Sequence, residues 1–134
     1  MQKPLFITVP HSGEKIPKET PWLENLSEPT VMRDVDRFVE KLYEDGAKKI
    51  DVPFLVAEWH RYVVDLNRLP EDIDEDSVIG ATNPSCSHVT GFHWRKTTQG
   101  EELMKQPITM ELHNQLADDY FWPFHKKVAD QIES

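Results

Sequence analysis

The chain has 134 residues, which is the size of a single domain, residues 1–134, and is long enough to bury a core. Its 15 basic and 24 acidic residues give a net charge of −9, which argues against a protein that binds nucleic acid or an anionic membrane surface. No apolar run approaches the ~18 residues that span a bilayer, and residues 1–10 lack the pattern of a signal peptide. We therefore expect a soluble, cytoplasmic protein.

The first predicted element is a buried strand over residues 5–9, where an apolar, β-branched run ends at Pro10. A helix is predicted next, because apolar residues recur on one helical face. These residues are Val31, Val35, Phe38, Val39, Leu42 and Tyr43. Ser27 is a suitable N-cap and Gly46 a suitable stop, so the sequence predicts one continuous helix between them.

Apolar runs at residues 52–57 and 62–66 predict two more strands. A second long helix is predicted over residues 108–132, where apolar side chains recur at every fourth position. Pro123 lies inside this helix and removes a backbone donor, so a kink is expected near Trp122. This order of strands and helices predicts an α/β fold with a mostly parallel sheet flanked by helices.

The sequence also supports predictions for two segments that lie between these elements. The acidic stretch 71–76 does not match an EF-hand, since Ser77 replaces the turn glycine and Asn83 replaces the bidentate glutamate. A solvated loop is predicted there. Cys86 is the single cysteine, which excludes an intrachain disulfide and a cysteine-based zinc cluster and predicts a reduced thiol.

His11, Ser12, Gly13 and Glu14 directly follow the first predicted strand. Open α/β sheets bind their ligands at the carboxyl ends of strands. The two small residues allow a tight turn, and an imidazole nitrogen with a carboxylate oxygen suits Zn²⁺. A histidine three residues before a glutamate is also common on protein surfaces. The spacing alone is therefore consistent with a metal half-site and with a solvated surface pair.

Asp65, Asn67 and Arg68 end the second apolar run. A guanidinium binds a carboxylate through two parallel hydrogen bonds, and a neighbouring amide can add a donor to the same anion. The pattern predicts either a binding site for a small carboxylate or an ion pair between Arg68 and an acidic neighbour, Asp65 or Glu71.

Four strings carry a family resemblance, namely VPHSGEKIP, RYVVDLNR, GEELMKQPI and YFWPFHKKV. In this order they resemble the N-formylglutamate amidohydrolases, deformylases that end one route of histidine degradation. The similarity extends from Pro4 to about Ile132. It implies a fold similar to that of the zinc carboxypeptidases, of the phosphorylase/hydrolase-like type, and a Zn²⁺ cofactor. Because family members are about twice as long, the chain resembles their N-terminal portion and is expected to be truncated.

The resemblance also implies roles for individual residues. The implied metal ligands are His11 and Glu14. The implied substrate-binding residues are Asn67 and Arg68, which hold the α-carboxylate, and Arg61, which supports them. The further supporting residues are Asp65 and His125, the second of which has a structural role or acts behind the site.

The family's third zinc ligand, a histidine in an Asp-x-His-Ser string, and its general base are expected beyond Ser134, so no base is assigned. His88, His93 and His113 are the candidates to replace that ligand. The main hypothesis is a metal-dependent amidohydrolase of an N-acyl amino acid such as N-formylglutamate, with zinc-activated water attacking the acyl carbonyl. The alternative is a catalytically incomplete relative that acts as a binding or subunit-forming module. An unpaired sheet edge further predicts a homo-oligomer or self-association, with little deformylase activity of the chain alone.

Overall fold

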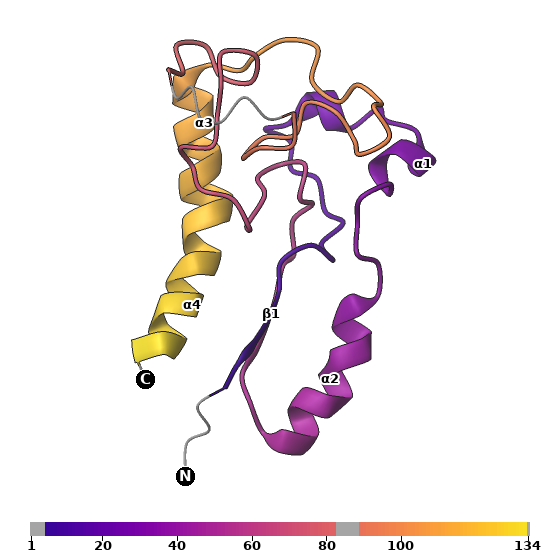
Figure 1. Ribbon diagram of the computed structural model, residues 1–134, viewed down its shortest axis with the longest axis vertical. Helices are drawn as coiled ribbons and strands as arrows, with labels where there is room; N and C mark the ends of the chain where they lie inside the picture. Colours follow the sequence, from indigo (N-terminus) through magenta and orange to yellow (C-terminus); the bar gives the residue numbers. More distant parts are fainter. Residues whose placement is uncertain (1–4, 83–88, 134) are drawn as a thin grey trace.

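The computed structural model describes residues 5–82 and 89–133, so the expectations for Cys86 and His88 lie outside the described residues. Strand β1 (Ile7–Val9) and strand β2 (Phe54–Val56) pair in parallel to form a sheet (Figure 1). The predicted strands at residues 5–9 and 52–57 are thus confirmed in shortened form. The α/β class with a parallel sheet is confirmed as well.

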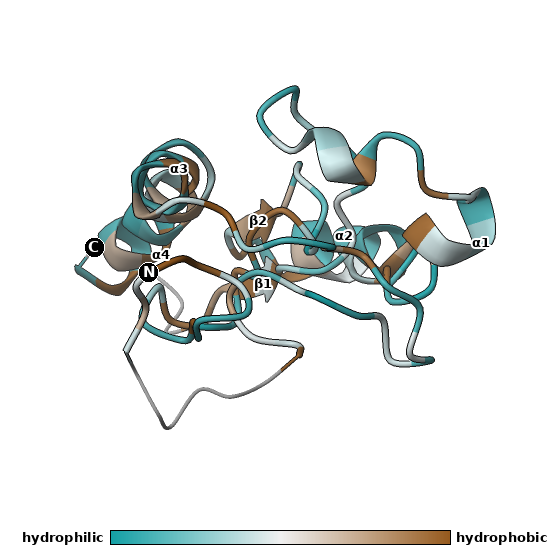
Figure 2. Cartoon of the chain, turned by 90° about the horizontal axis from the view of Figure 1, so that it is seen from above, coloured by the Kyte–Doolittle hydropathy of each residue, from teal (hydrophilic) through white to brown (hydrophobic). Residues whose placement is uncertain are grey.

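Helices lie on both sides of this sheet (Figures 1 and 2). Helix α2 (Val39–Ile50) contacts both strands from one side. A long C-terminal helix lies on the other side, and it is built from three consecutive segments. They are α3 (Met110–Leu116), the π-helical turn η3 (Ala117–Phe121) and α4 (Trp122–Glu133). The π turn ends two residues before Pro123, whose missing N–H disturbs the regular hydrogen-bond pattern of the preceding turn.

The helix predicted between Ser27 and Gly46 is in fact two helices. Ser27 caps the short helix α1 (Glu28–Val31) as expected, and its hydroxyl accepts a hydrogen bond from the Thr30 N–H at 3.4 Å. The helix then breaks before α2 begins, because Phe38 has a left-handed backbone with φ 67°. Side chains predicted to face the core are consequently exposed, namely Phe38, Leu42 and Tyr43.

Gly46 lies inside α2 and does not end it. The helix stops at Asp51, which has φ 53° and whose N–H bonds to the carbonyl groups of Ala47 and Lys48. A left-handed residue at this position is a common helix terminator, although glycine usually fills it. The sequence therefore placed the end of this helix five residues too early.

We expect Gly46→Ala to raise the free energy of unfolding by about 0.5–1 kcal/mol, because glycine destabilises a helix interior relative to alanine. No neighbouring atom outside the helix lies within 4 Å of the position that a Cβ would take. Urea unfolding of the parent and the variant measures the change. A lower stability of the variant would instead indicate that the helix stops at Gly46.

Residues 62–66, predicted as a strand, form turns at the centre of the core. Tyr62 and Asp65 are fully buried. The Asp65 N–H donates to the Phe92 carbonyl at 2.9 Å, so this buried backbone group is satisfied without a sheet. The prediction of a strand was wrong because an apolar run indicates burial, and buried turns share that pattern with buried strands.

The acidic stretch 71–76 is less solvated than predicted. Ile73 is buried in the core, and the Arg95 guanidinium lies 3.8 Å from the Asp74 carboxylate and 3.6 Å from that of Asp76. The segment is therefore a loop, as expected, but it is anchored to the rest of the domain. Among the described residues, no helix is long and apolar enough to cross a membrane.

Candidate metal and carboxylate site

The turn after β1 carries His11 and Glu14 and packs closely against the segment after β2. Gly13 makes this approach possible, since a Cβ on it would lie 2.3 Å from the Trp59 carbonyl oxygen. Nearby, the backbone N–H of His60 donates to the Lys15 carbonyl at 2.8 Å. The small residue in the motif therefore serves a close backbone approach, which fixes His11 at the carboxyl end of β1.

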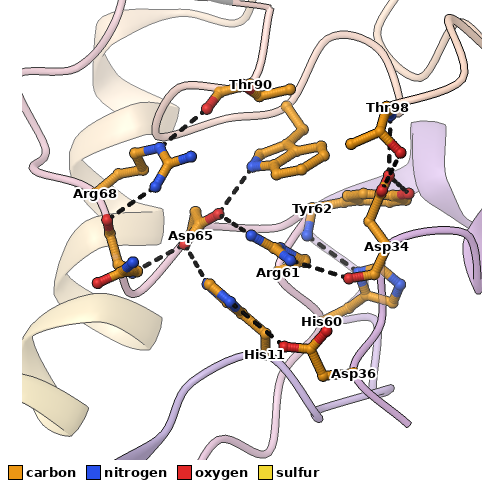
Figure 3. Close-up of polar contacts among 12 residues, drawn as sticks. His11, Asp34, Asp36, His60, Arg61, Tyr62, Asp65, Arg68, Thr90 and Thr98 are labelled. Carbon is orange, nitrogen blue, oxygen red and sulfur yellow. Dashed lines mark hydrogen bonds and ion pairs between the residues drawn. The ribbon is translucent and has the colours of Figure 1, made fainter.

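Asp65 is the centre of the site (Figure 3). Its buried carboxylate accepts hydrogen bonds from His11 Nε2 at 2.7 Å, Arg61 Nη2 at 3.1 Å, Trp94 Nε1 at 2.9 Å and the Asn67 N–H at 2.9 Å. Burial alone would raise the pKa of Asp65, but the hydrogen bond and charge of His11 and the charge of Arg61 outweigh it and lower this pKa to about 2. Asp65 is therefore an anion at neutral pH.

The ionised Asp65 fixes the orientation of the His11 ring. A carboxylate can only accept, so His11 Nε2 carries a hydrogen and donates it to Asp65. The second ring nitrogen, Nδ1, faces Asp36 Oδ2 at 3.9 Å. A histidine that binds a metal commonly donates its other ring N–H to a carboxylate, which sets the tautomer. His11 has this arrangement, with Nδ1 as the nitrogen that is free to bind a metal.

Glu14 lies on the same turn and beside Arg37, with 3.6 Å between Glu14 Oε2 and Arg37 Nε. Its side chain is 42% exposed. Within residues 5–82 and 89–133, no group of three or more His, Cys, Asp or Glu side chains is arranged to hold a metal ion. His11 and Glu14 thus stand as two candidate donors on one turn.

Arg61 is engaged inside the protein. Its Nη2 donates to Asp65, its Nη1 donates to the Asp34 carbonyl at 3.0 Å, and the guanidinium lies 4.6 Å from the centroid of the Trp94 ring. These contacts hold both Arg61 and Asp65 in place. They suit a supporting role better than direct binding of a substrate.

Asn67 and Arg68 lie in the turn that follows Asp65. The Asn67 N–H donates to the Asp65 carboxylate, and the Arg68 N–H donates to the Asp65 carbonyl at 3.1 Å. The Arg68 guanidinium donates to the carbonyl groups of Thr90 and Asn67, both at 3.1 Å. These carbonyl contacts orient the guanidinium without neutralising its charge. The Asp65 carboxylate forms its ion pair with Arg61 instead.

His125 reaches this turn from α4. Its Nε2 donates to the Leu66 carbonyl at 2.8 Å, and its ring stacks on Phe121 with 4.3 Å between the centroids. The contact fixes the backbone one residue before Asn67. The family resemblance implied a structural role or a position behind the site for His125, and this role stays a prediction.

Two of the histidines proposed as replacement ligands, His93 and His113, are buried in the core. His93 Nδ1 donates to the Val63 carbonyl at 2.9 Å, and His93 Nε2 bonds to His113 Nδ1 at 2.8 Å. Burial lowers the pKa of His93 to about 3 and also lowers the pKa of His113. Both nitrogens of His93 are therefore occupied, so the expectation that it replaces a metal ligand was wrong.

Two residues of the site were not found from the sequence. Trp94 donates to the carboxylate of Asp65 although the two are 29 positions apart in the chain. Asp36, which falls within the helix predicted between Ser27 and Gly46, lies beside His11. No short-range pattern marks either residue, because both contacts join segments that are distant along the chain.

A solved structure defines the class of fold. The crystal structure of N-formylglutamate amidohydrolase from Ralstonia eutropha JMP134 matches with a TM-score of 0.83 at 21% sequence identity. The match covers 97% of this chain and 48% of that one. At this level of identity the likeness shows a shared α/β fold.

Sequence comparison then identifies the family. A family profile described as N-formylglutamate amidohydrolase matches residues 3–134. The N-formylglutamate deformylase of Pseudomonas aeruginosa is 31% identical over 134 residues, covering 96% of this chain and 45% of the relative. That of Pseudomonas putida is 27% identical over 132 residues, covering 97% and 45%. The chain belongs to the N-formylglutamate amidohydrolase family, as the resemblance predicted, and it spans about half the length of the curated relatives it matches.

Proposed function

We propose that this chain forms the metal- and carboxylate-binding part of an amidohydrolase that removes the formyl group from N-formylglutamate. The position of Asp65 carries the proposal. One buried carboxylate orients His11 on one side and, through the Asn67 N–H, anchors the turn that presents Arg68 on the other. A metal ligand and a cation for the substrate's carboxylate would thereby be held in a fixed relation. The names of the two Pseudomonas relatives support the choice of substrate.

His11 and Glu14 are the residues that would hold the metal. The ring of His11 is already oriented by Asp65, and Glu14 offers a partly exposed carboxylate on the same turn. Such a nitrogen and oxygen donor set fits Zn²⁺. Zinc, when bound, supplies polarisation of the acyl carbonyl and a water of lowered pKa. This arrangement would correspond to a zinc carboxypeptidase-like site.

Asn67 and Arg68 would bind the α-carboxylate of the substrate. The Arg68 guanidinium is planar and is held by carbonyl groups, so it is prepared for a two-point interaction with a carboxylate. Arg61 would act through Asp65, because its contacts with Asp65, Asp34 and Trp94 are internal. Binding at this clamp would place the formyl group of the substrate relative to His11.

We expect Arg68→Lys to weaken the binding of N-formyl-L-glutamate about tenfold, because lysine keeps the charge but loses the two-point geometry. Calorimetric titration of the zinc-supplemented chain measures this affinity. N-formyl-L-isoglutamine, in which the α-carboxylate is an amide, is the matched ligand. It should bind the parent weakly and lose little further affinity in the variant.

Arg33→Lys is the matched control variant, because Arg33 pairs with Glu101 at 2.8 Å, apart from the proposed clamp. It should leave the affinity for N-formyl-L-glutamate unchanged. If Arg68→Lys lowers the melting temperature without changing ligand affinity, Arg68 is structural and the clamp is wrong. Formate release from N-formyl-L-glutamate that depends on zinc and on His11 tests the reaction itself.

A further inference from the structure

Asp36 faces the nitrogen of His11 that Asp65 leaves free. Asp65 Oδ1 lies 2.7 Å from His11 Nε2, and Asp36 Oδ2 lies 3.9 Å from His11 Nδ1 (Figure 3). The imidazole ring therefore lies between two carboxylates that contact it in different ways. The contact with Asp65 is a short hydrogen bond, whereas the distance to Asp36 exceeds the roughly 2.7–3.2 Å of a hydrogen bond.

The distance between Asp36 and His11 matches the separation of two ligands around one zinc ion. Bonds of about 2.0–2.2 Å from zinc to nitrogen and oxygen place two tetrahedral ligand atoms about 3.4 Å apart. The same bonds in a straight line would place them about 4.2 Å apart. The observed 3.9 Å lies between these limits, so a small movement of the exposed Asp36 side chain would complete the geometry.

The backbone holds Asp36 in this position. The Asp36 N–H donates to the His11 carbonyl at 2.9 Å, which ties the two residues together independently of their side chains. Two residues later Phe38 takes its left-handed conformation, with φ 67°. For a residue with a bulky side chain this conformation costs about 1–2 kcal/mol, and such strain concentrates at functional sites. The strained turn separates Asp36 from α2 and leaves it beside His11.

The Glu14 carboxylate has no such contact with the imidazole ring of His11. Its carboxylate lies beside the Arg37 guanidinium, whose positive charge opposes the binding of a cation there. Asp36 has His11 as the partner of its carboxylate. We propose that Asp36 is a ligand of the metal together with His11, and that it contributes more to metal affinity than Glu14. The inference rests on the proposed metal site and adds a residue that the sequence motif does not contain.

The test is zinc binding by the full 134-residue chain, measured by calorimetry for the parent and for single variants. Asp36→Asn should weaken zinc binding at least about tenfold, since even residues behind a metal ligand typically contribute 10–100-fold. Glu14→Gln should weaken it less than Asp36→Asn does. Asp45→Asn, which removes the same charge from an exposed position on α2, should have no effect.

Nitrogen NMR of the histidine rings gives a second readout that does not depend on activity. In the parent, zinc should shift the His11 Nδ1 signal, while Nε2 keeps the signature of a donor to Asp65. In Asp36→Asn the same zinc concentration should produce a much smaller shift. The unbound spectra of both proteins should otherwise agree, because Asp36 is exposed and asparagine has nearly its shape.

The outcomes separate this inference from the proposed function. Equal zinc affinity of the parent and Asp36→Asn overturns the role of Asp36, as does a loss of binding in Glu14→Gln with Asp36→Asn unaffected. A parent chain that binds no zinc overturns this inference together with the metal part of the proposed function. Normal zinc binding without binding of N-formyl-L-glutamate would leave Asp36 in place and contradict the substrate.

Discussion

Asp65→Asn is expected to lower the free energy of unfolding by about 3–5 kcal/mol, the cost of removing one partner from a buried ion pair. Asparagine keeps one acceptor oxygen but turns the other into an NH₂ group. That group would face donors, either His11 Nε2 or the N–H groups of Arg61 and Trp94. Arg61, whose side chain is 12% exposed, would keep a charge without its carboxylate partner. Urea unfolding measures the loss.

The same substitution should change the response to acid. The pKa of Asp65 is about 2 in the folded protein and 3.8 for an unperturbed aspartate, so the ionised form favours folding. This contribution, about 2 kcal/mol, is complete above pH 4 and is lost as the pH falls from 3.8 towards 2. The variant should lack this part of the acid dependence.

Asp45→Asn is the control for both measurements, because it changes an exposed aspartate on α2. It should unfold like the parent in urea and keep the parent's acid profile. A buried carboxylate that accepts hydrogen bonds from several side chains cannot be replaced without a clear loss of stability. An Asp65→Asn protein with unchanged stability and unchanged acid dependence would therefore contradict the central position of Asp65.

Gly13→Ala is expected to lower the free energy of unfolding by about 3 kcal/mol, at the upper end of the usual cost of overpacking. The added Cβ would lie 2.3 Å from the Trp59 carbonyl oxygen and 2.8 Å from the Glu58 carbonyl carbon. Both are backbone atoms, so no side chain can rotate away to relieve the contact. The turn with His11 and the segment after β2 would have to separate.

This separation should also move His11 relative to Asp65, so the NMR signal of His11 Nε2 should lose its hydrogen-bonded character. Gly46→Ala makes the same chemical change in an open helical position and is expected to stabilise the protein. The two substitutions are thus expected to change the free energy of unfolding in opposite directions. This difference distinguishes a steric conflict at Gly13 from a general effect of replacing glycine. A Gly13→Ala protein as stable as the parent would show that the turn does not need its close approach.

The sequence by itself determined the local elements and the chemistry available to the site. Short-range patterns located β1, β2 and the C-terminal helix, and the Ser27 cap was identified correctly. The four strings VPHSGEKIP, RYVVDLNR, GEELMKQPI and YFWPFHKKV identified the family, and a family profile that matches residues 3–134 confirms it. The sequence also supplied the chemical groups of the site, since His11, Asp65 and Arg68 were singled out by their residue types and by the family resemblance.

Tertiary structure alone decided the conformation of residues 62–66, the break before α2 and the partners of His11. Hydrophobic patterns indicate which residues are buried, but they do not specify which distant groups satisfy a buried backbone or carboxylate. The hydrogen bond between His11 and Asp65 spans 54 positions, and that between Trp94 and Asp65 spans 29. Asp36 reaches His11 because the chain leaves the helical path at Phe38, whose left-handed conformation no helix propensity predicts. Contacts of this kind depend on how separate segments pack, and packing is a property of the whole folded chain.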